Sequence, residues 1–514
     1  MGRGLALAAT GGVLAAFGAA CGGSSPATAS TNPDTLPQLR GGTTISVSSS
    51  PAGPKVPSAF LGLSMEYHNL SDYVGLNPAK PNPTFLQLLS NLNPTGTPIL
   101  RMGGDSTDWT WWPVPGMSRP GGAKFALTPR YASTLKAVAQ GVHGKLLLGI
   151  NFEADSRRLA AYEEHQLTKR IGGSRIIAFE LGNEPELYHK YAWYKTPSGR
   201  GVLGRPRDYT VQAFIQDYAS IAAGLPNEPL AGPESSSTTW INLPDFLSTQ
   251  PRLSLVTLHT YPLKHCSPSA HPTESELFLP ASLQGLASEV AGWVKLAGAR
   301  HRPLRVDEMN SVTCGGYLPV TGSFGPALWA LNVLPMYVQA GAVGVNFHTV
   351  PFTWQALIQP VDNKPVYKGS GQLHVEPEYY GLLAFAQLAP SGSQLLKTSA
   401  PANAGIFEWA DRTPAGNENV VVTNPSSTAG NVKVNVPSQS GSGVVTILRA
   451  DGGLGASNGI SLGGQSLSTK TGQLTGTINS TTVKPTGHTY RLHVPGASAV
   501  ILTFESPEFK ALHR

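Results

Sequence analysis

The stretch IIAFELGNEPELY, residues 176–188, decides the fold of this chain. Its first six residues form an apolar run interrupted only by Glu180, which is typical of a strand buried inside a parallel sheet. Asn183, Glu184 and Pro185 follow and end the run. In barrels of parallel strands, functional residues gather where the strands end at their carboxyl termini. The stretch therefore predicts a buried strand that delivers polar side chains to a functional site.

Short apolar runs of the same kind recur on both sides of this stretch and make eight in total. The others are 60–65, 98–102, 145–150, 230–233, 253–259, 303–308 and 342–348. Segments with helical spacing separate them, among them 84–92, 131–140, 212–224, 281–298 and 325–340. The alternation predicts an α/β fold, a (β/α)8 TIM barrel over residues 51–390. A doubly wound sheet is the alternative, but no glycine-rich phosphate loop follows the first strand.

The composition changes after residue 390. Residues 391–514 alternate β-rich runs with Gly, Ser, Asn and Thr turns, and helical periodicity is absent. They predict a C-terminal antiparallel β-sandwich domain. A lone strand within residues 42–50 precedes the barrel. A single strand is not stable alone, so we expect it to join the C-terminal sandwich.

The first 41 residues read as export and tether segments. Residues 1–21 combine Arg3, an uncharged stretch and small residues before Cys21, as in a secretory signal. A membrane span is the alternative, but the stretch is short and rich in Gly and Ala. The small residues before Cys21 resemble a bacterial lipoprotein box, although Gly18 stands where that pattern has Leu. Residues 22–41 are polar and aperiodic, which predicts a flexible tether. We expect a secreted protein or one attached to the cell surface through lipid on Cys21.

The composition excludes several classes of function. Gly 57 and Pro 43, with only 13% charged residues, argue against a helical bundle. The net charge of +6 is small and no Lys/Arg run is present, so nucleic-acid binding is not expected. The sequence contains no HExxH motif and no Cys/His set with zinc spacing. We expect neither a metal nor a cofactor.

Two cysteines remain in the body of the chain, Cys266 and Cys314. In an exported protein they can form a disulfide; two buried free thiols are the alternative. Both follow strand-like runs that carry candidate site residues. A disulfide would therefore join two loops at the same end of the fold.

Two carboxylates stand at predicted strand ends, Glu184 after the fourth strand and Glu308 at the end of the seventh. Carboxylates that face each other across a barrel are the requirement for cleaving a glycosidic bond, one as proton donor and one ionised. Alternatives remain at each position. Glu184 could end its strand at a surface turn. Glu308 could pair with Arg101 or Arg305, with Asp307 as the active acid.

Further polar and aromatic residues lie near these strand ends. His259 and Tyr261 are two apart and hence share one face of the sixth strand, although His259 could instead be a satisfied core histidine. Asp105 is a sugar ligand or a helix cap, and Glu66 lies in the substrate site or in solvent. For the Trp cluster at 109, 111 and 112 we favour packing over stacking on sugar.

Several stretches together resemble glycoside hydrolase family 79, the β-glucuronidase and heparanase family, within the clan of retaining (β/α)8-barrel glycosidases. The stretches are RMGGDSTDW (101–109), ELGNEPELY (180–188), LHTYP (258–262), DEMNS (307–311), FGPALWALN (324–332) and PEYYGLLAFAQL (377–388). The resemblance implies that Glu184 is the general acid/base and Glu308 the nucleophile. It also implies that Asn183 binds the sugar 2-hydroxyl, Tyr261 lies beside Glu308, and Arg101 is a cation behind the nucleophile.

The resemblance further implies a carbohydrate substrate, a β-glucuronide or a glycan containing glucuronic acid, and cleavage with retention. Its carboxylate would be bound by backbone N–H groups and a tyrosine, for which the loop 313–317 with Gly316 and Tyr317 is the candidate. A Cys266–Cys314 disulfide would hold that loop. The alternatives are another sugar (xyloside, arabinofuranoside or glucoside) or a non-catalytic carbohydrate-binding lipoprotein.

Overall fold

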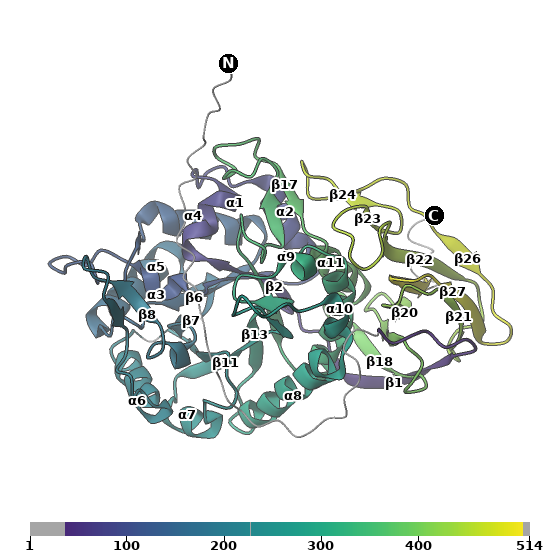
Figure 1. Ribbon diagram of the computed structural model, residues 1–514, viewed down its shortest axis with the longest axis horizontal. Helices are drawn as coiled ribbons and strands as arrows, with labels where there is room; N and C mark the ends of the chain where they lie inside the picture. Colours follow the sequence, from purple (N-terminus) through teal and green to yellow (C-terminus); the bar gives the residue numbers. More distant parts are fainter. Residues whose placement is uncertain (1–35, 227, 507–514) are drawn as a thin grey trace, which may run out of the picture.

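The computed structural model describes residues 36–226 and 228–506, and it divides into a barrel and a large sheet (Figure 1). Eight parallel strands close the barrel in the order β10-β11-β13-β15-β2-β3-β6-β7. Their bounds are β2 Leu61–Glu66, β3 Ile99–Gly103, β6 Lys145–Ile150, β7 Ile176–Leu181, β10 Leu230–Ser235, β11 Leu253–Thr260, β13 Leu304–Met309 and β15 Gly344–Thr349. Neighbouring strands follow one another along the chain. The predicted TIM barrel is confirmed.

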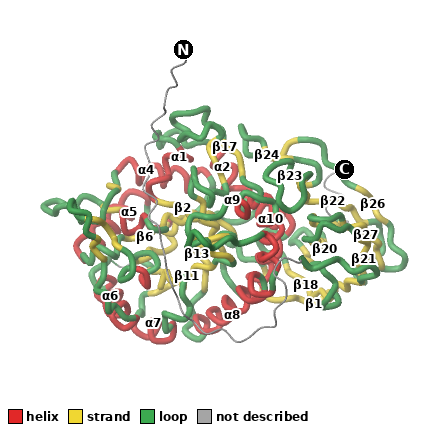
Figure 2. Tube along the Cα trace, in the orientation of Figure 1, coloured by secondary structure: helices red, strands yellow, loops and turns green. Residues whose placement is uncertain are grey.

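Helices surround the barrel strands, as the red segments of Figure 2 show. The longer ones are α2 Pro83–Asn91, α4 Pro129–Gly141, α5 Arg157–Ile171, α6 Val211–Ala222, α7 Leu243–Thr249, α8 Gln284–Gly298, α10 Gly325–Ala340 and α11 Glu378–Leu388. Side-chain caps set several starts: Thr128, Ser156 and Thr210 each accept a hydrogen bond from the backbone three residues on. Such caps satisfy backbone donors that the first helical turn leaves open.

The second body is a ten-stranded sheet in the order β23-β22-β28-β20-β19-β18-β1-β21-β27, with β26 beside β22. The strand predicted within residues 42–50 is part of it and is longer than expected, β1 spanning Thr44–Lys55. It pairs antiparallel with β18 (Gln394–Ser399) and parallel with β21 (Gly430–Asn435). The sheet is therefore mixed rather than purely antiparallel, because β1 enters from the other end of the chain.

The strands of this sheet enclose a core of their own. The remaining long strands are β19 Phe407–Arg412, β20 Glu418–Asn424, β22 Gly443–Ala450, β27 Thr489–Val494 and β28 Ser498–Phe504. Ile45 of β1, Val432 of β21 and Val500 of β28 are all buried in one apolar cluster. The N-terminal strand thus stabilises a C-terminal core, as the sequence predicted.

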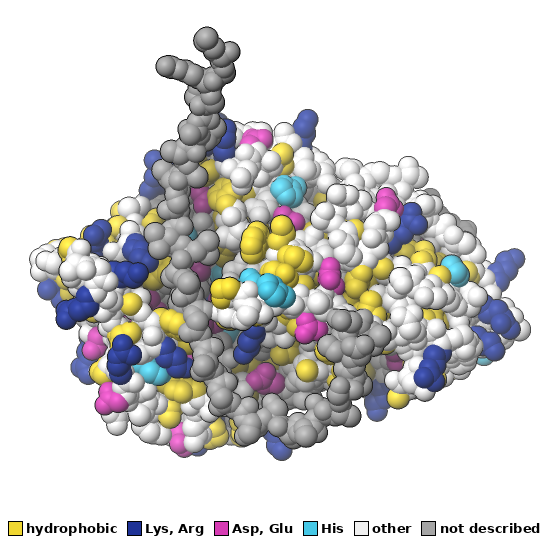
Figure 3. Space-filling model, in the orientation of Figure 1, with side chains coloured by type: hydrophobic (Ala, Val, Ile, Leu, Met, Phe, Trp, Pro, Cys, Tyr) yellow, Lys and Arg dark blue, Asp and Glu magenta, His cyan; other side chains and the backbone are white. Residues whose placement is uncertain are grey.

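The described helices include none that is long and apolar enough to cross a membrane. Cys21 and the predicted signal segment lie outside the described residues. On the face drawn in Figure 3, Lys and Arg side chains are scattered, several of them near the edges of the molecule, and form no continuous patch.

Candidate active site

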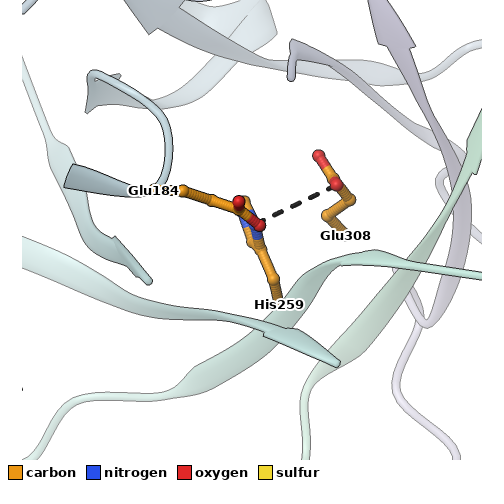
Figure 4. A group of neighbouring side chains, drawn as sticks. All are labelled: Glu184, His259 and Glu308. Atoms are coloured by element: carbon orange, nitrogen blue, oxygen red, sulfur yellow. Dashed lines mark hydrogen bonds and ion pairs between the residues drawn. The ribbon is translucent and has the colours of Figure 1, made fainter. Parts of the chain in front are cut away.

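Glu184 and Glu308 meet at the carboxyl ends of the barrel strands, with His259 between them (Figure 4). Glu184 follows β7, His259 lies in β11, and Glu308 lies in β13. His259 Nδ1 is 3.0 Å from Glu184 Oε1 and 4.0 Å from Glu308 Oε1. One oxygen of each carboxylate and one nitrogen of His259 all lie within 4.8 Å of one another. The barrel thus places the two predicted carboxylates face to face.

The Glu308 carboxylate is held by a dense set of donors. Arg101 Nη1 donates to Oε2 at 2.6 Å, and the Tyr261 hydroxyl donates to Oε1 at 2.8 Å. His348 Nδ1 lies 3.7 Å from Oε2. Burial by itself raises the pKa of Glu308. The charges of His348, His259 and Arg101 and the Tyr261 hydrogen bond outweigh this effect and lower the pKa to about 2. Glu308 is therefore ionised at neutral pH, as a nucleophile must be.

Arg101 in β3 is fully buried and binds residues at the ends of β7, β10 and β13. Besides Glu308, its guanidinium donates to Glu180 Oε2 at 2.8 Å, Glu234 Oε2 at 2.7 Å and Asn183 Oδ1 at 3.1 Å. The same cation thus orients the amide of Asn183 and the carboxylate of Glu308. Arg101 lies behind Glu308, where the resemblance placed it.

Glu180 and Glu234 were not among the predicted site residues, although both are wholly buried at the base of the site. Burial raises the pKa of both carboxyl groups. Repulsion from Asp307 adds to this at both residues, and Arg101 opposes it. A signal was available in the sequence, since Glu180 interrupts the apolar strand β7 and Glu234 directly follows the apolar first residues of β10.

Asp307, the alternative to Glu308, lies deeper in the barrel. Its Oδ1 accepts from the Leu258 backbone N–H at 2.8 Å, and its Oδ2 is 3.2 Å from His259 Nε2. Its side chain has no exposed area, whereas that of Glu308 is 9% exposed and that of Glu184 is 18% exposed. Of these three acids, only Glu184 and Glu308 are therefore open to a substrate. His259 is buried, yet it contacts both the exposed and the buried carboxylates, so it is not merely a core residue.

Glu66 and Asp105 border the same site. Glu66 Oε2 accepts from the Ser106 backbone N–H at 2.8 Å, and its Oε1 is 3.6 Å from His348 Nε2. Asp105 stands at the start of a short helix but makes no capping hydrogen bond. Its pKa is raised to about 8 by burial and by the charges of Glu66, Glu184 and Glu308. Asp105 is nevertheless solvent-exposed, and the charges of these glutamates favour the protonated form of its carboxyl group.

Cys266 and Cys314 form a disulfide that joins the loops after β11 and β13. Cys314, Gly315 and Gly316 all have positive φ, between 60° and 86°. A Cβ on Gly316 would lie 2.7 Å from the backbone of Trp354, so this close approach requires glycine. The next residue, Gln355, donates from Nε2 to the Tyr261 hydroxyl at 3.2 Å. The loop is thereby connected to Glu308 through Tyr261.

Tyr317 closes this loop and packs against the loop after β11. Its ring centroid is 4.5 Å from that of His265, and its hydroxyl lies 3.3 Å from His271 Nδ1. Neither histidine was expected from the sequence. The tryptophans follow the packing interpretation at Trp111 and Trp112, which are buried, whereas Lys124 Nζ lies 3.7 Å above the partly exposed ring of Trp109.

Two sets of donor atoms have the spacing of metal ligands, Glu184-His259-Glu308 and Glu234-His259-Asp307. Three of these carboxylates already contact Arg101, at 2.6–3.3 Å. The guanidinium therefore supplies locally the positive charge that a metal ion would otherwise provide.

A (β/α)8 barrel with paired carboxylates at the carboxyl ends of its strands defines the class of glycosidases that use two acids. No family model matches the chain. Over 406 residues it is 23% identical to the beta-glucuronidase of Neurospora crassa. The aligned residues make up 70% of this chain and 68% of that protein. The chain is a glycosidase with β-glucuronidase-like sequence, as predicted.

Solved structures confirm the fold. A 4-O-alpha-L-rhamnosyl-beta-D-glucuronidase from Fusarium oxysporum 12S has a TM-score of 0.69 at 17% identity, covering 90% of this chain and 100% of that one. A family 51 arabinofuranosidase from Xanthomonas axonopodis pv. citri has a TM-score of 0.60 at 13% identity, with the same coverage.

The Tyr261–Glu308 contact generates a pH prediction. Tyr261 donates to the ionised carboxylate, so Tyr261→Phe raises the pKa of Glu308. A hydrogen bond to a charged group contributes about 1.5–3 kcal/mol, which corresponds to roughly one to two pKa units. We expect the acidic limb of the kcat/KM profile to move upward by that amount, so that activity is lost earlier as the pH falls. The profile of kcat/KM measures this, because it reports the free enzyme.

Tyr337→Phe is the matched control for this experiment. Tyr337 is a buried tyrosine, and its hydroxyl lies 3.0 Å from that of Thr260 rather than from a carboxylate. Its substitution should leave the acidic limb in place. An unmoved limb in Tyr261→Phe would contradict the assignment of Glu308 as the group that must be ionised.

Proposed function

We propose that the protein hydrolyses β-glucuronides with retention of configuration, with Glu308 as nucleophile and Glu184 as general acid/base. The observation that carries the proposal is the pairing of an ionised, donor-bound Glu308 with the more exposed Glu184, with oxygens within 4.8 Å of each other. Retaining enzymes place their carboxyl groups about 5–5.5 Å apart, whereas inverting enzymes need about 6.5–9.5 Å for a water molecule. The short spacing favours double displacement.

In the first step Glu308 attacks the anomeric carbon while Glu184 gives its proton to the departing glycosidic oxygen. The bond from carbon to that oxygen breaks, and a covalent glycosyl–Glu308 intermediate forms. In the second step Glu184, now a carboxylate, takes a proton from water, and the water oxygen displaces Glu308. Arg101 and Tyr261 stabilise the Glu308 carboxylate that leaves.

Asn183 is placed to bind the sugar beside the reacting carbon. Arg101 holds its Oδ1 at 3.1 Å, so the Nδ2 group is the part that can donate to a sugar hydroxyl. In this class of enzyme hydrogen bonds to the 2-hydroxyl strengthen in the transition state. The amide therefore contributes to catalysis as well as to binding.

Recognition of a uronic acid requires donors aimed at a carboxylate. Backbone N–H groups in consecutive turn-like residues form concave anion sites, and the positive φ values of Cys314, Gly315 and Gly316 produce such a backbone next to Tyr317. The disulfide keeps this loop beside the Tyr261–Glu308 pair. The beta-glucuronidase and the rhamnosyl-glucuronidase among the similar proteins support the same sugar.

A panel of 4-nitrophenyl glycosides tests the substrate. We expect kcat/KM for the β-glucuronide to exceed that for the β-glucoside by about a hundredfold or more, because each donor left unpaired in a buried site costs about 1–3 kcal/mol. Proton NMR of the first-formed product should show the β-anomer. Equal rates for the two sugars would overturn the glucuronide assignment. Preference for a β-xyloside or an α-L-arabinofuranoside would favour the alternative sugars instead.

Substitution of the nucleophile tests the mechanism separately from the sugar. Glu308→Ala should abolish turnover. Azide should restore part of it by occupying the place of the missing carboxylate, giving a glycosyl azide of inverted anomeric configuration. Glu408→Ala, at a partly buried glutamate of the sheet, is the control and should keep wild-type rates. Turnover in Glu308→Ala without azide at the wild-type rate would refute the assignment.

We also propose that the protein is exported and held at the cell surface by lipid on Cys21. A disulfide among the described residues supports an oxidising compartment. Expression in a bacterial host with labelled palmitate should label the wild-type protein and not Cys21→Ser. Equal labelling of both, or of neither, would contradict attachment at Cys21.

A further inference from the structure

Asp108 has no predicted role, yet both of its carboxylate oxygens are bound by loops of the site. It lies in the short helix α3 (Ser106–Trp109) after β3 and is 2% exposed. Oδ1 accepts from the backbone N–H groups of Phe152 at 2.8 Å and Glu153 at 2.9 Å. Oδ2 accepts from the Asn183 backbone N–H at 3.2 Å and from the Tyr188 hydroxyl at 2.6 Å. One carboxylate therefore joins the loop after β6 to the loop that carries Glu184.

The loop after β7 needs such support because its backbone is unusual. Glu184 itself has left-handed backbone angles, φ 48° and ψ 60°, which non-glycine residues adopt only when the surroundings impose them. Gly182 has φ 84°, and a Cβ there would lie 2.1 Å from the Tyr188 hydroxyl. The backbone N–H of Glu184 donates to Glu234 O at 2.8 Å. Asp108 and Tyr188 thus hold one side of the peptide segment and β10 holds the other.

The carbonyl of Asp108 extends the same connection. It accepts from Asn151 Nδ2 at 2.9 Å and from Trp193 Nε1 at 2.8 Å. Trp193 belongs to β8 (Ala192–Lys195), the first strand of the hairpin that follows the Glu184 loop. Asp108 is therefore bonded to the chain on both sides of Glu184, at Asn183 and Tyr188 through its carboxylate and at Trp193 through its backbone.

We propose that Asp108, through Tyr188 and the Asn183 backbone, is the positioning residue that orients the carboxyl group of the acid/base Glu184. The inference rests on the proposed function, because it takes Glu184 as the proton donor. Asp108 acts through the backbone and touches neither the substrate nor the carboxylate of Glu184. Its ionised form is required, since the carboxylate accepts four hydrogen bonds and donates none. An amide at this position would turn an NH2 group toward N–H or O–H donors.

Leaving-group dependence distinguishes a misplaced acid from general structural damage. The first chemical step, which kcat/KM reports, needs a proton donor for a poor leaving group such as phenol and much less for 2,4-dinitrophenol. The experiment compares kcat/KM for the phenyl and 2,4-dinitrophenyl glycosides of the sugar that the enzyme prefers. The variants are Asp108→Asn, Tyr188→Phe and, as the reference for loss of the acid, Glu184→Gln.

We expect Asp108→Asn to lower kcat/KM for the phenyl glycoside by about a hundredfold, the scale of a misplacement of about 1 Å, and to change the dinitrophenyl value by less than about threefold. Tyr188→Phe, which keeps the ring but removes the hydroxyl, should show the same selectivity with a smaller loss. Asp411→Asn is the matched control: it removes a buried carboxylate of β19 that bonds Asn419, and it should leave both values unchanged.

The outcomes separate the inference from the proposed function. If Glu184→Gln itself lowers kcat/KM equally for both substrates, the assignment of Glu184 as proton donor fails. Suppose instead that Glu184→Gln lowers kcat/KM mainly for the phenyl glycoside. If Asp108→Asn and Tyr188→Phe then lower kcat/KM equally for both substrates, or for neither, the positioning role of Asp108 is overturned. Circular dichroism and the thermal midpoint are measured for each variant. If Asp108→Asn does not fold, the selectivity of Tyr188→Phe decides the question.

Discussion

The site depends on one buried cation, the guanidinium of Arg101. A charge without exposed area is tolerated only when it is paired and hydrogen-bonded, and Arg101 meets that condition with Glu180, Glu234 and Glu308. Removing it would leave several carboxylates uncompensated in the centre of the barrel. The same guanidinium orients Asn183 and keeps Glu308 ionised. One side chain thus both compensates the buried carboxylates and binds two residues of the candidate site.

The barrel decides where this cation can act. Parallel strands bring their carboxyl ends to one rim. Residues of β3, β7, β11 and β13 that are far apart in sequence therefore meet at the candidate site. The loops after those strands are then held to each other by further contacts. Asp108 connects the loops after β6 and β7, and the Cys266–Cys314 disulfide connects those after β11 and β13. Rigid strands and joined loops together hold the two carboxylates within reach of one bond.

Sequence reasoning identified the carboxylates that face the opening and missed much of what lies behind them. Glu184 and Glu308 were visible because each ends an apolar run at a predicted strand terminus. Glu180 lies inside such a run and Glu234 directly follows one; a lone charged residue there shows that something must neutralise it but not what. His348 ends the apolar run 342–348 and was not singled out, and Asp108 gave no signal of its own, because the importance of both comes from partners many residues away. For Asp105, periodicity could not separate a helix cap from an acid in the site; in the structure its side chain makes no capping hydrogen bond.

The sequence by itself determined the order of strands and helices, the strand ends that carry acids, and the change to a β-rich C-terminal segment. These follow from periodicity, turn residues and local chemistry, which act over a few neighbouring residues. Only the tertiary structure decided that β1 completes a mixed sheet with β18 and β21, and that one arginine serves several strand ends. It also decided the pKa values, because burial and the distance to other charges exist only after the chain has folded. A strand end can be predicted from its own residues. The residues that its side chains contact lie on other strands and become neighbours only when the barrel closes.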